Sequence, residues 1–329
     1  MSLYRGCLWA YYRITEDPKL GVPGSINCVD CRTQWLDFEV QRAVADGIDQ
    51  VVVVAAGFDT RAYRLRSLPQ LKFFEVDRPE VIRKKRALVD KALPAASWHR
   101  PIYVPADLSR VTLAEALGSG TGFDRTRPAL FLVEGLVYYL PVRAVHALIQ
   151  SVADLAEPGS RLCFDFLHLD ALEGRAKYAG WEQMRGRGPS ELGKDRRWHR
   201  RIPPLAFSPP LCADLVAGKG EPMVSGFQHD GDSMAKMLRR HGLELTELLS
   251  PTQMLQRFMP DQSIASLHTD RPAIVPYFSY TSCTKPGYEE RAIQVLKAAE
   301  DEQEEAQPLP KPGPVVPEAA TLPLKSSYL

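Results

Sequence analysis

Hydrophobic and polar positions divide this chain into short apolar runs separated by longer amphipathic segments. The first clear run, residues 51–54, is four consecutive valines. An uninterrupted run does not alternate between two faces, so it predicts a central parallel strand that is buried on both sides. Further apolar runs predict strands over residues 72–76, 102–105, 129–133, 161–167, 243–249 and 273–281.

Segments with helical periodicity lie between these strands. Trp35, Phe38, Val40 and Val44 form an apolar stripe, and Gly47 is placed to end that helix before the valine strand. Similar patterns predict helices over residues 79–91, 141–156 and 231–241. Regular alternation of strands and helices indicates an α/β fold with a doubly wound, mostly parallel sheet.

The chain is expected to have five parts. Residues 1–48 form a helical segment, 49–169 the nucleoside-binding core, 170–230 an insertion that acts as a lid, 231–306 the rest of the sheet with a final helix, and 307–329 a disordered Pro-rich tail. The basic stretch at 185–201 is interpreted as a solvated helix with loops. The alternative is that one or two of its arginines contact an anionic substrate.

Composition narrows the possible partners. Lys and Arg total 41 against 40 Asp and Glu, so no global field favours nucleic acid or membrane. With no signal sequence and no long apolar run, we expect a soluble cytoplasmic protein. Six irregularly spaced cysteines indicate reduced thiols. Cys28 and Cys31 are interpreted as two ordinary cysteines near a helix start rather than as a metal site.

The turn after the valine strand carries the first chemical signal. Ala55 and Gly57 keep it bare, so a ligand can lie against the backbone. Asp77 follows Gly57 by twenty residues at the end of the next strand, where a carboxylate can accept hydrogen bonds from ribose hydroxyls. The glycine-rich phosphate cradle of nicotinamide-binding domains is missing, and Asp59 would repel a pyrophosphate. These features favour S-adenosylmethionine, an adenosine ligand without phosphate.

Two further strand ends add candidate contacts. Asp107 and Leu108 follow the third strand, where a carboxylate can accept from the adenine amine and an apolar side chain can pack on the ring. An Asp that caps a helix starting near Ser109 is an equally good explanation. Glu134 ends the fourth strand, and ligands of open α/β sheets bind at the carboxyl ends of strands.

Taken in order, these motifs resemble the leucine carboxyl methyltransferase family. The resemblance is carried by Arg32 and Thr33 with Asp37, and by residues 50–65, 73–85, 106–108 and 134–141. It is greatest to a branch of candidate S-adenosylmethionine-dependent O-methyltransferases. It implies a class I methyltransferase fold, a Rossmann-like sheet of seven strands whose last strand is antiparallel, with S-adenosyl-L-methionine as cofactor.

The resemblance also implies roles for individual residues. The first glycine of the family's usual turn is Ala55 here, while Gly57 is kept. Arg5 is a weak candidate for a second basic contact to the methionine carboxylate. The expected contacts are Arg32 to the methionine carboxylate, Ala55, Gly57 and Asp59 in the turn under the cofactor, Asp77 to the ribose, Asp107 and Leu108 to the adenine, and Glu134 at the methionine end.

The expected activity is in-line methyl transfer to a small molecule or a terminal carboxylate. A carboxylate acceptor is already ionised at neutral pH and needs no general base. A phenol or alcohol would need one, and His168, Tyr138 and Tyr139 are the nearest candidates, each more readily explained as structural. No catalytic residue is assigned. The alternatives are an inactive S-adenosylmethionine-binding or scaffold protein of the same fold and, less favoured, a nicotinamide-dependent oxidoreductase.

Overall fold

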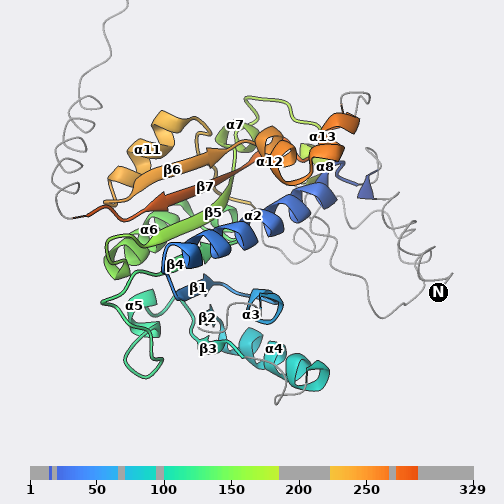
Figure 1. Cartoon of the computed structure of the whole chain (residues 1–329). Coiled ribbons are helices and arrows are strands. Elements are labelled where there is room, and N and C mark those ends of the chain that lie inside the picture. The colour runs from blue at the N-terminus through green and yellow to red at the C-terminus, as the bar shows by residue number, and fades with distance from the viewer. Residues whose placement is uncertain are drawn as a thin grey trace, which may run out of the picture.

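A single seven-stranded sheet with helices on both faces organises the described part of the chain (Figure 1). The computed structural model describes residues 15–16, 21–65, 71–93, 100–184, 223–266 and 272–287. The strand order is β3-β2-β1-β4-β5-β7-β6. The strands are β1 (Gln50–Val54), β2 (Lys72–Asp77), β3 (Ile102–Pro105), β4 (Leu130–Val133), β5 (Arg161–Leu167), β6 (Glu244–Leu249) and β7 (Phe278–Thr284).

The direction of the strands decides the fold class. β3, β2, β1, β4 and β5 pair in parallel, whereas β7 pairs antiparallel with both β5 and β6. The carboxyl ends of β1 to β5 therefore meet at one edge, and the strand order reverses between β1 and β4, where open α/β sheets bind ligands. The predicted class I methyltransferase topology, seven strands with the last antiparallel, is confirmed.

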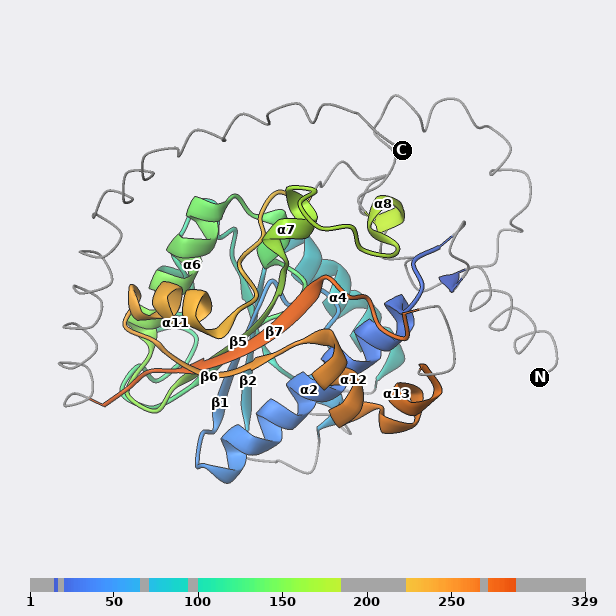
Figure 2. The ribbon, with the colours of Figure 1, turned by 90° about the horizontal axis from the view of Figure 1, so that it is seen from above.

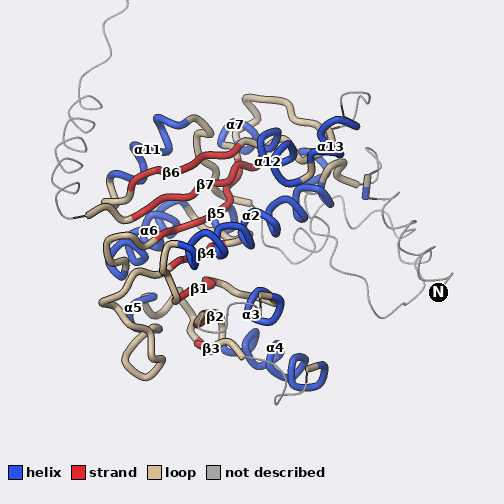
Figure 3. Tube along the Cα trace, in the orientation of Figure 1, coloured by secondary structure: helices blue, strands red, loops and turns tan. Residues whose placement is uncertain are grey.

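The valines of β1 explain why helices cover both faces. Val51 and Val53 belong to a core shared with α2 (Ser25–Ala45) and α12 (Pro251–Phe258). Val52 and Val54 face the other core, which is shared with α5 (Leu113–Ala116), α6 (Val142–Leu155) and α11 (Gly231–Arg239). Figure 2 shows α2 beside α12 and α6 beside α11, and Figure 3 separates the strands from the helices around them.

The remaining described helices are short, apart from α4, which contacts β3. They are α3 (Arg61–Arg64), α4 (Pro79–Ala92), α7 (Leu169–Leu172), α8 (Trp181–Met184), α13 (Pro260–Ser266) and the 3-10 helix η2 (Val137–Tyr139). The predicted strands and helices agree with the observed ones to within one or two residues, except at the last strand and at the helix expected near Ser109. Gly47 ends the first helix segment as expected, with φ of +85°.

The last strand was expected at 273–281, but β7 runs from Phe278 to Thr284. Ile274 and Val275 are buried in a loop, not in the sheet. This loop crosses the start of α2 so closely that a Cβ on Gly24 would lie 2.6 Å from the backbone of Ile274. Burial by a crossing loop thus produced the same apolar pattern as a strand.

Several predictions concern residues outside the described ranges. The basic stretch 185–201, the final helix expected after residue 287 and the tail 307–329 all lie there, as does Arg5. The five-part division of the chain stays a prediction. No described helix is long and apolar enough to cross a membrane. Cys28 and Cys31 are buried cysteines on α2, and burial raises the pKa of Cys31 to about 12.

Candidate functional site

The turn after β1 and the end of β2 meet directly. Ala55 and Gly57 adopt positive φ values of 52° and 48°, which glycine accommodates and alanine does so only with strain. The backbone N–H of Gly57 donates to Oδ2 of Asp77 at 2.6 Å, and that of Arg78 donates to Oδ1 at 2.7 Å. Asp77 is therefore fixed at the turn, and its contact with a ribose stays a prediction.

Asp59 has a different environment from the one the sequence suggested. Its side chain is 6% exposed and forms an ion pair with Arg61 Nη1, while the Arg61 backbone N–H donates to its Oδ1 at 2.6 Å. The nearby guanidinium balances the negative charge, so repulsion of a pyrophosphate by Asp59 is a weaker argument than we expected. The case against a dinucleotide now depends on the missing glycine-rich cradle.

Glu134, at the end of β4, bridges two arginines. Its Oε1 accepts from Arg32 Nε at 2.9 Å, and its Oε2 accepts from Arg61 Nη1 at 2.7 Å. Burial alone would raise the pKa of Glu134, but the two guanidinium groups together lower it. The carboxylate is consequently ionised at neutral pH. One of the two guanidinium groups belongs to Arg32, itself a predicted site residue.

Asp165 on β5 completes this network. Its Oδ2 accepts from Arg32 Nη1 at 2.8 Å, and its Oδ1 accepts from the Gly135 N–H at 2.7 Å. Gly135 has a φ of +65°, and a Cβ there would lie 3.5 Å from the Tyr138 hydroxyl and 3.7 Å from Arg32 Nη1. The tight backbone after β4 is thus held by a carboxylate from the neighbouring strand.

Sequence reasoning missed both Asp165 and Arg61 as members of the site. Each had a signal. Asp165 is the one carboxylate in the run of residues 161–167, and a charged residue inside a buried strand needs a partner. Arg61 follows the turn directly and reaches Asp37 on α2, with Nε 3.0 Å from Oδ1. Asp37 also pairs with Arg64, so α2 and α3 are joined through charged groups.

The end of β3 lies next to Asp77. The Ala106 N–H donates to the Asp77 carbonyl at 2.8 Å, and Asp107 follows at the surface. Asp107 Oδ1 accepts from the backbone and side chain of Ser109 at 3.0 and 2.7 Å, and these bonds lower the pKa of Asp107. Leu108 is partly buried against the second core.

The helix expected near Ser109 begins instead at Leu113. Thr112 accepts from the Glu115 N–H, and the Glu115 side chain accepts from the Thr112 N–H, so these two residues form the capping box of α5. Asp107 thus closes a turn instead of capping a helix. Its side chain is at the same edge of the sheet as Asp77.

Two of the candidate general bases, His168 and Tyr138, are engaged in contacts with other side chains. His168 is buried, with Nε2 2.8 Å from Ser279 Oγ and Nδ1 3.4 Å from the Tyr178 hydroxyl. Burial, with a contribution from His229, lowers the pKa of His168 to about 4. The Tyr138 hydroxyl contacts Arg32 at 3.4 Å, and burial raises the pKa of Tyr138. These contacts support the structural interpretation of both residues.

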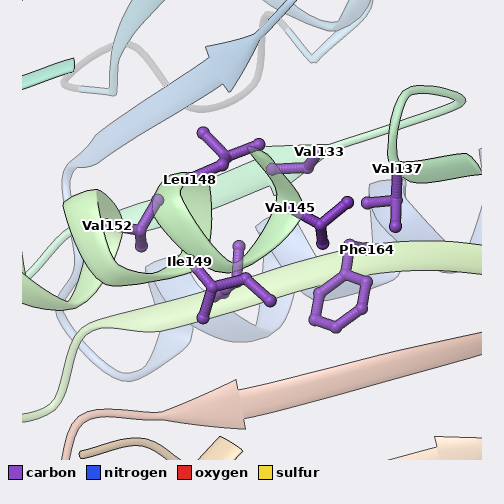
Figure 4. Close-up of a pocket in the computed structure, with 8 residues that line it drawn as sticks. Val133, Val137, Val145, Leu148, Ile149, Val152 and Phe164 are labelled. Atoms are coloured by element: carbon purple, nitrogen blue, oxygen red, sulfur yellow. The ribbon is translucent and has the colours of Figure 1, made fainter. Parts of the chain in front are cut away.

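A small apolar cavity lies between α6 and strands β4 and β5. Side chains of β4, β5 and α6, including Val133, Val145 and Phe164, surround a volume of about 10 Å³ (Figure 4). That is the size of a single water molecule, and apolar cavities of this kind stay dry. It is a packing defect of the second core rather than a ligand site.

Comparison with known proteins agrees with these motifs. Residues 11–153 match the model of the leucine carboxyl methyltransferase family. A candidate S-adenosyl-L-methionine-dependent methyltransferase of Mycobacterium sp. strain JLS is 40% identical over 158 residues, 47% of this chain and 57% of that protein. A similarly named protein of Mycolicibacterium smegmatis is 37% identical over 176 residues, 53% of this chain and 58% of that protein. The chain spans somewhat more than half the length of these curated relatives.

The similarity to solved structures is weaker. A DUF574 family protein from Streptomyces avermitilis is 19% identical, with a TM-score of 0.49 over 78% of this chain and 83% of that one. Magnesium protoporphyrin IX methyltransferase from Synechocystis, solved with bound SAH, is 14% identical, with a TM-score of 0.42 over 78% of this chain and 84% of that one. The residues that match the leucine carboxyl methyltransferase model, 11–153, contain the turn after β1, Asp77 and Glu134, so the similarity to that family covers the candidate site.

Proposed function

We propose that this chain is an S-adenosyl-L-methionine-dependent O-methyltransferase that acts on a carboxylate or hydroxyl of a small molecule or of a chain terminus. The observation that carries the proposal is the hydrogen bond from the Gly57 N–H to Asp77. This bond joins a bare turn to a carboxylate that could accept hydrogen bonds from a ribose, at the reversal point of the sheet. The names of the mycobacterial relatives support the same activity.

The charge of the site also suits this cofactor. Three guanidinium groups and four carboxylates form the network, which leaves one negative charge before Asp77 is added. The cofactor carries a sulfonium, an ammonium and a carboxylate, hence a net positive charge, so the two are complementary. The network consists of Arg32, Arg61, Arg64, Asp37, Asp59, Glu134 and Asp165.

Arg32 retains a group for the methionine carboxylate. Its Nε and Nη1 are engaged by Glu134, Asp165 and Tyr138, whereas Nη2 donates no hydrogen bond to any residue in the described ranges. The side chain is 17% exposed. A guanidinium that is held by protein carboxylates through Nε and Nη1 can still donate a single charge-assisted hydrogen bond from Nη2 to an anionic ligand.

Asp77 keeps acceptor capacity for the ribose. Each of its carboxylate oxygens accepts one backbone N–H, and each has a second lone pair for a hydroxyl donor. Glu134, ionised between its two arginines, would face the ammonium of the methionine end. Asp107, exposed beside Asp77, would accept from the adenine amine while Leu108 packs on the ring. Asp59 would shape the turn from below through Arg61.

The protein's part in the reaction is positioning. When bound, the cofactor supplies the activated methyl group. Correct alignment of acceptor and donor can lower a barrier by roughly 7–11 kcal/mol. His168, the nearest histidine candidate, is enclosed by Ser279 and Tyr178, so it is not available as a general base. This supports a carboxylate acceptor over a hydroxyl, because an ionised carboxylate gives up no proton.

Calorimetric binding of S-adenosylhomocysteine tests the cofactor assignment. Asp77→Ala and Glu134→Ala should each weaken binding at least tenfold, because each loses charge-assisted contacts. Glu173→Ala, at an exposed carboxylate paired with Arg175, should bind like the wild type. Equal affinity of all four proteins would contradict the assignment. In a thermal-shift assay, stabilisation by NAD or NADP but not by S-adenosylhomocysteine would indicate an oxidoreductase.

Labelled methyl transfer tests the acceptor class. Methyl esters release methanol in mild base, whereas methyl ethers do not, so base-labile product from a panel of carboxylic acids and phenols would support the carboxylate. Base-stable product would indicate a hydroxyl acceptor. Cofactor binding without transfer to any acceptor would favour the inactive, scaffold interpretation.

A further inference from the structure

Three residues with metal-ligating side chains meet beyond the carboxyl end of β5. They are His168, which follows β5 directly, Asp170 on α7, and His229 in the segment before α11. One ligand atom from each lies within 4.8 Å of the other two. The backbone holds the two segments together, since Phe227 donates to the Leu167 carbonyl and accepts from the Leu169 N–H, both at 2.9 Å. None of the three belongs to the proposed cofactor site.

His168 has the surroundings of an oriented ligand. Its side chain is buried, and Nε2 is 2.8 Å from Ser279 Oγ. When Nε2 carries the hydrogen and donates it to Ser279, the lone pair of Nδ1 is on the side of Tyr178 and Asp170. Metal-bound histidines usually donate their other ring N–H to a neighbouring acceptor, which sets the tautomer and the orientation of the ring.

Asp170 supplies a carboxylate oxygen that the protein leaves unsatisfied. Its Oδ2 accepts from the Tyr178 hydroxyl at 2.8 Å. Its Oδ1 is buried and has no hydrogen-bond partner among the residues that the structure describes. Burying a carboxylate oxygen without a partner is costly, and a cation bound at this atom would remove the cost.

His229 is exposed and can move. Its ring stacks on that of His168, with centroids 4.0 Å apart and planes inclined by 13°. In stacked rings the nitrogen lone pairs lie in two nearly parallel planes and do not point at a common position. The His229 ring must therefore turn before both histidines can bind the same ion. Nitrogen and oxygen ligands bind zinc at about 2.0–2.2 Å, which corresponds to about 3–4 Å between ligand atoms. Rotation of an exposed side chain can supply this small contraction.

We propose that His168, Asp170 and His229 form a binding site for a divalent first-row transition-metal ion such as Zn²⁺. Two imidazoles and one carboxylate are a donor set that suits zinc and its neighbours, whereas Mg²⁺ and Ca²⁺ prefer sites made of oxygen atoms alone. The proposal is independent of the methyltransferase assignment, because it concerns residues outside the cofactor network.

Titration of the chelator-treated full chain with ZnCl₂ tests the site. We expect one Zn²⁺ per chain, a visible absorption band when Co²⁺ replaces it, and no competition from Mg²⁺. His229→Ala and Asp170→Asn should each weaken Zn²⁺ binding at least tenfold. His229→Ala should keep the wild-type unfolding temperature without metal, since His229 is exposed, but lose most of the increase that Zn²⁺ causes.

The chain offers a matched control in a second histidine pair. His146, on α6, has its Nδ1 2.9 Å from Nε2 of His241, which follows α11. Among the described residues this pair belongs to no cluster of three metal-ligating side chains. His241→Ala should leave Zn²⁺ affinity unchanged. The proposal is overturned if the wild type binds no Zn²⁺ in stoichiometric amount. It is equally overturned if binding survives in the His229→Ala/Asp170→Asn double variant, which would assign the ion to other groups.

Discussion

Replacement of Asp165 by Asn tests whether the charged network holds the fold as well as the site. Asp165 is 2% exposed and lies at the centre of the sheet edge. Its two oxygens accept from Arg32 Nη1 at 2.8 Å and from the Gly135 N–H at 2.7 Å. Asparagine has nearly the same shape, so Asp165→Asn changes charge and hydrogen bonding with little change in volume.

The size of the effect follows from these contacts. The amide oxygen can still accept from Gly135, but the amide NH₂ then faces a guanidinium N–H, so a charge-assisted bond is replaced by two opposed donors. Removing one partner of a buried ion pair costs about 3–5 kcal/mol. Arg32 keeps Glu134 and is 17% exposed, so we expect the lower end, about 3 kcal/mol. Typical domains have only about 5–15 kcal/mol in total.

Urea denaturation followed by circular dichroism measures this loss. With a slope of about 3 kcal/mol/M, the midpoint should fall by about 1 M. Glu173→Gln, at an exposed pair with Arg175, is the control and should leave the midpoint in place. A shift below about 0.3 M in Asp165→Asn, equivalent to about 1 kcal/mol, would refute the reasoning, because it would mean that Glu134 and Tyr138 satisfy Arg32 without Asp165.

Three further predictions use other parts of the molecule. Gly57→Ala and Gly47→Ala should each lose about 1–2 kcal/mol of stability, because both glycines have positive φ, although no atom lies closer than 4.0 Å to the added Cβ. Calorimetry should show that only Gly57→Ala weakens S-adenosylhomocysteine binding. Equal weakening in both variants would argue against contact at Gly57. Lys85 Nζ lies 2.5 Å from Glu75, and both are buried, so Lys85→Met should cost about 3–5 kcal/mol. Burial raises the pKa of Glu75, and Lys85 opposes this shift. Without Lys85 the folded state favours the protonated acid still more, so the loss of unfolding free energy, measured with urea, should be large at pH 8 and smaller at pH 5. A loss that does not change with pH would contradict this prediction. Burial, together with a neighbouring histidine, lowers the pKa of His241 from 6.5 to about 4. The unfolded chain therefore binds the proton first, and stability should fall as the pH drops from about 6.5 to 4; His241→Gln should reduce that fall by on the order of 1 kcal/mol after allowing for partial exposure. Thermal unfolding at several pH values measures this, and the same pH dependence of stability in both proteins would contradict it.

The sequence by itself determined the sheet and the positions of its strand-end groups. Four valines in a row require a strand covered on both sides, and alternation with helices requires parallel pairing. Parallel strands bring their carboxyl ends to one edge, so Asp77, Asp107 and Glu134 had to lie at that edge wherever the helices packed. The bare turn at Ala55 and Gly57 was equally legible, because small residues there leave the backbone open.

Only the tertiary structure decided how the charges are paired. Arg32 meets Glu134 and Asp165 across sequence separations of 102 and 133 residues, and no local pattern encodes which carboxylate reaches which guanidinium. The same holds for Arg61, which meets Asp37 and Glu134 across sequence separations of 24 and 73 residues. Local periodicity reports burial but not its cause, so a buried loop at 274–277 looked like part of β7. Side-chain pairing and the meeting of His168 with His229 depend on the distances between packed elements, which the folded chain alone specifies.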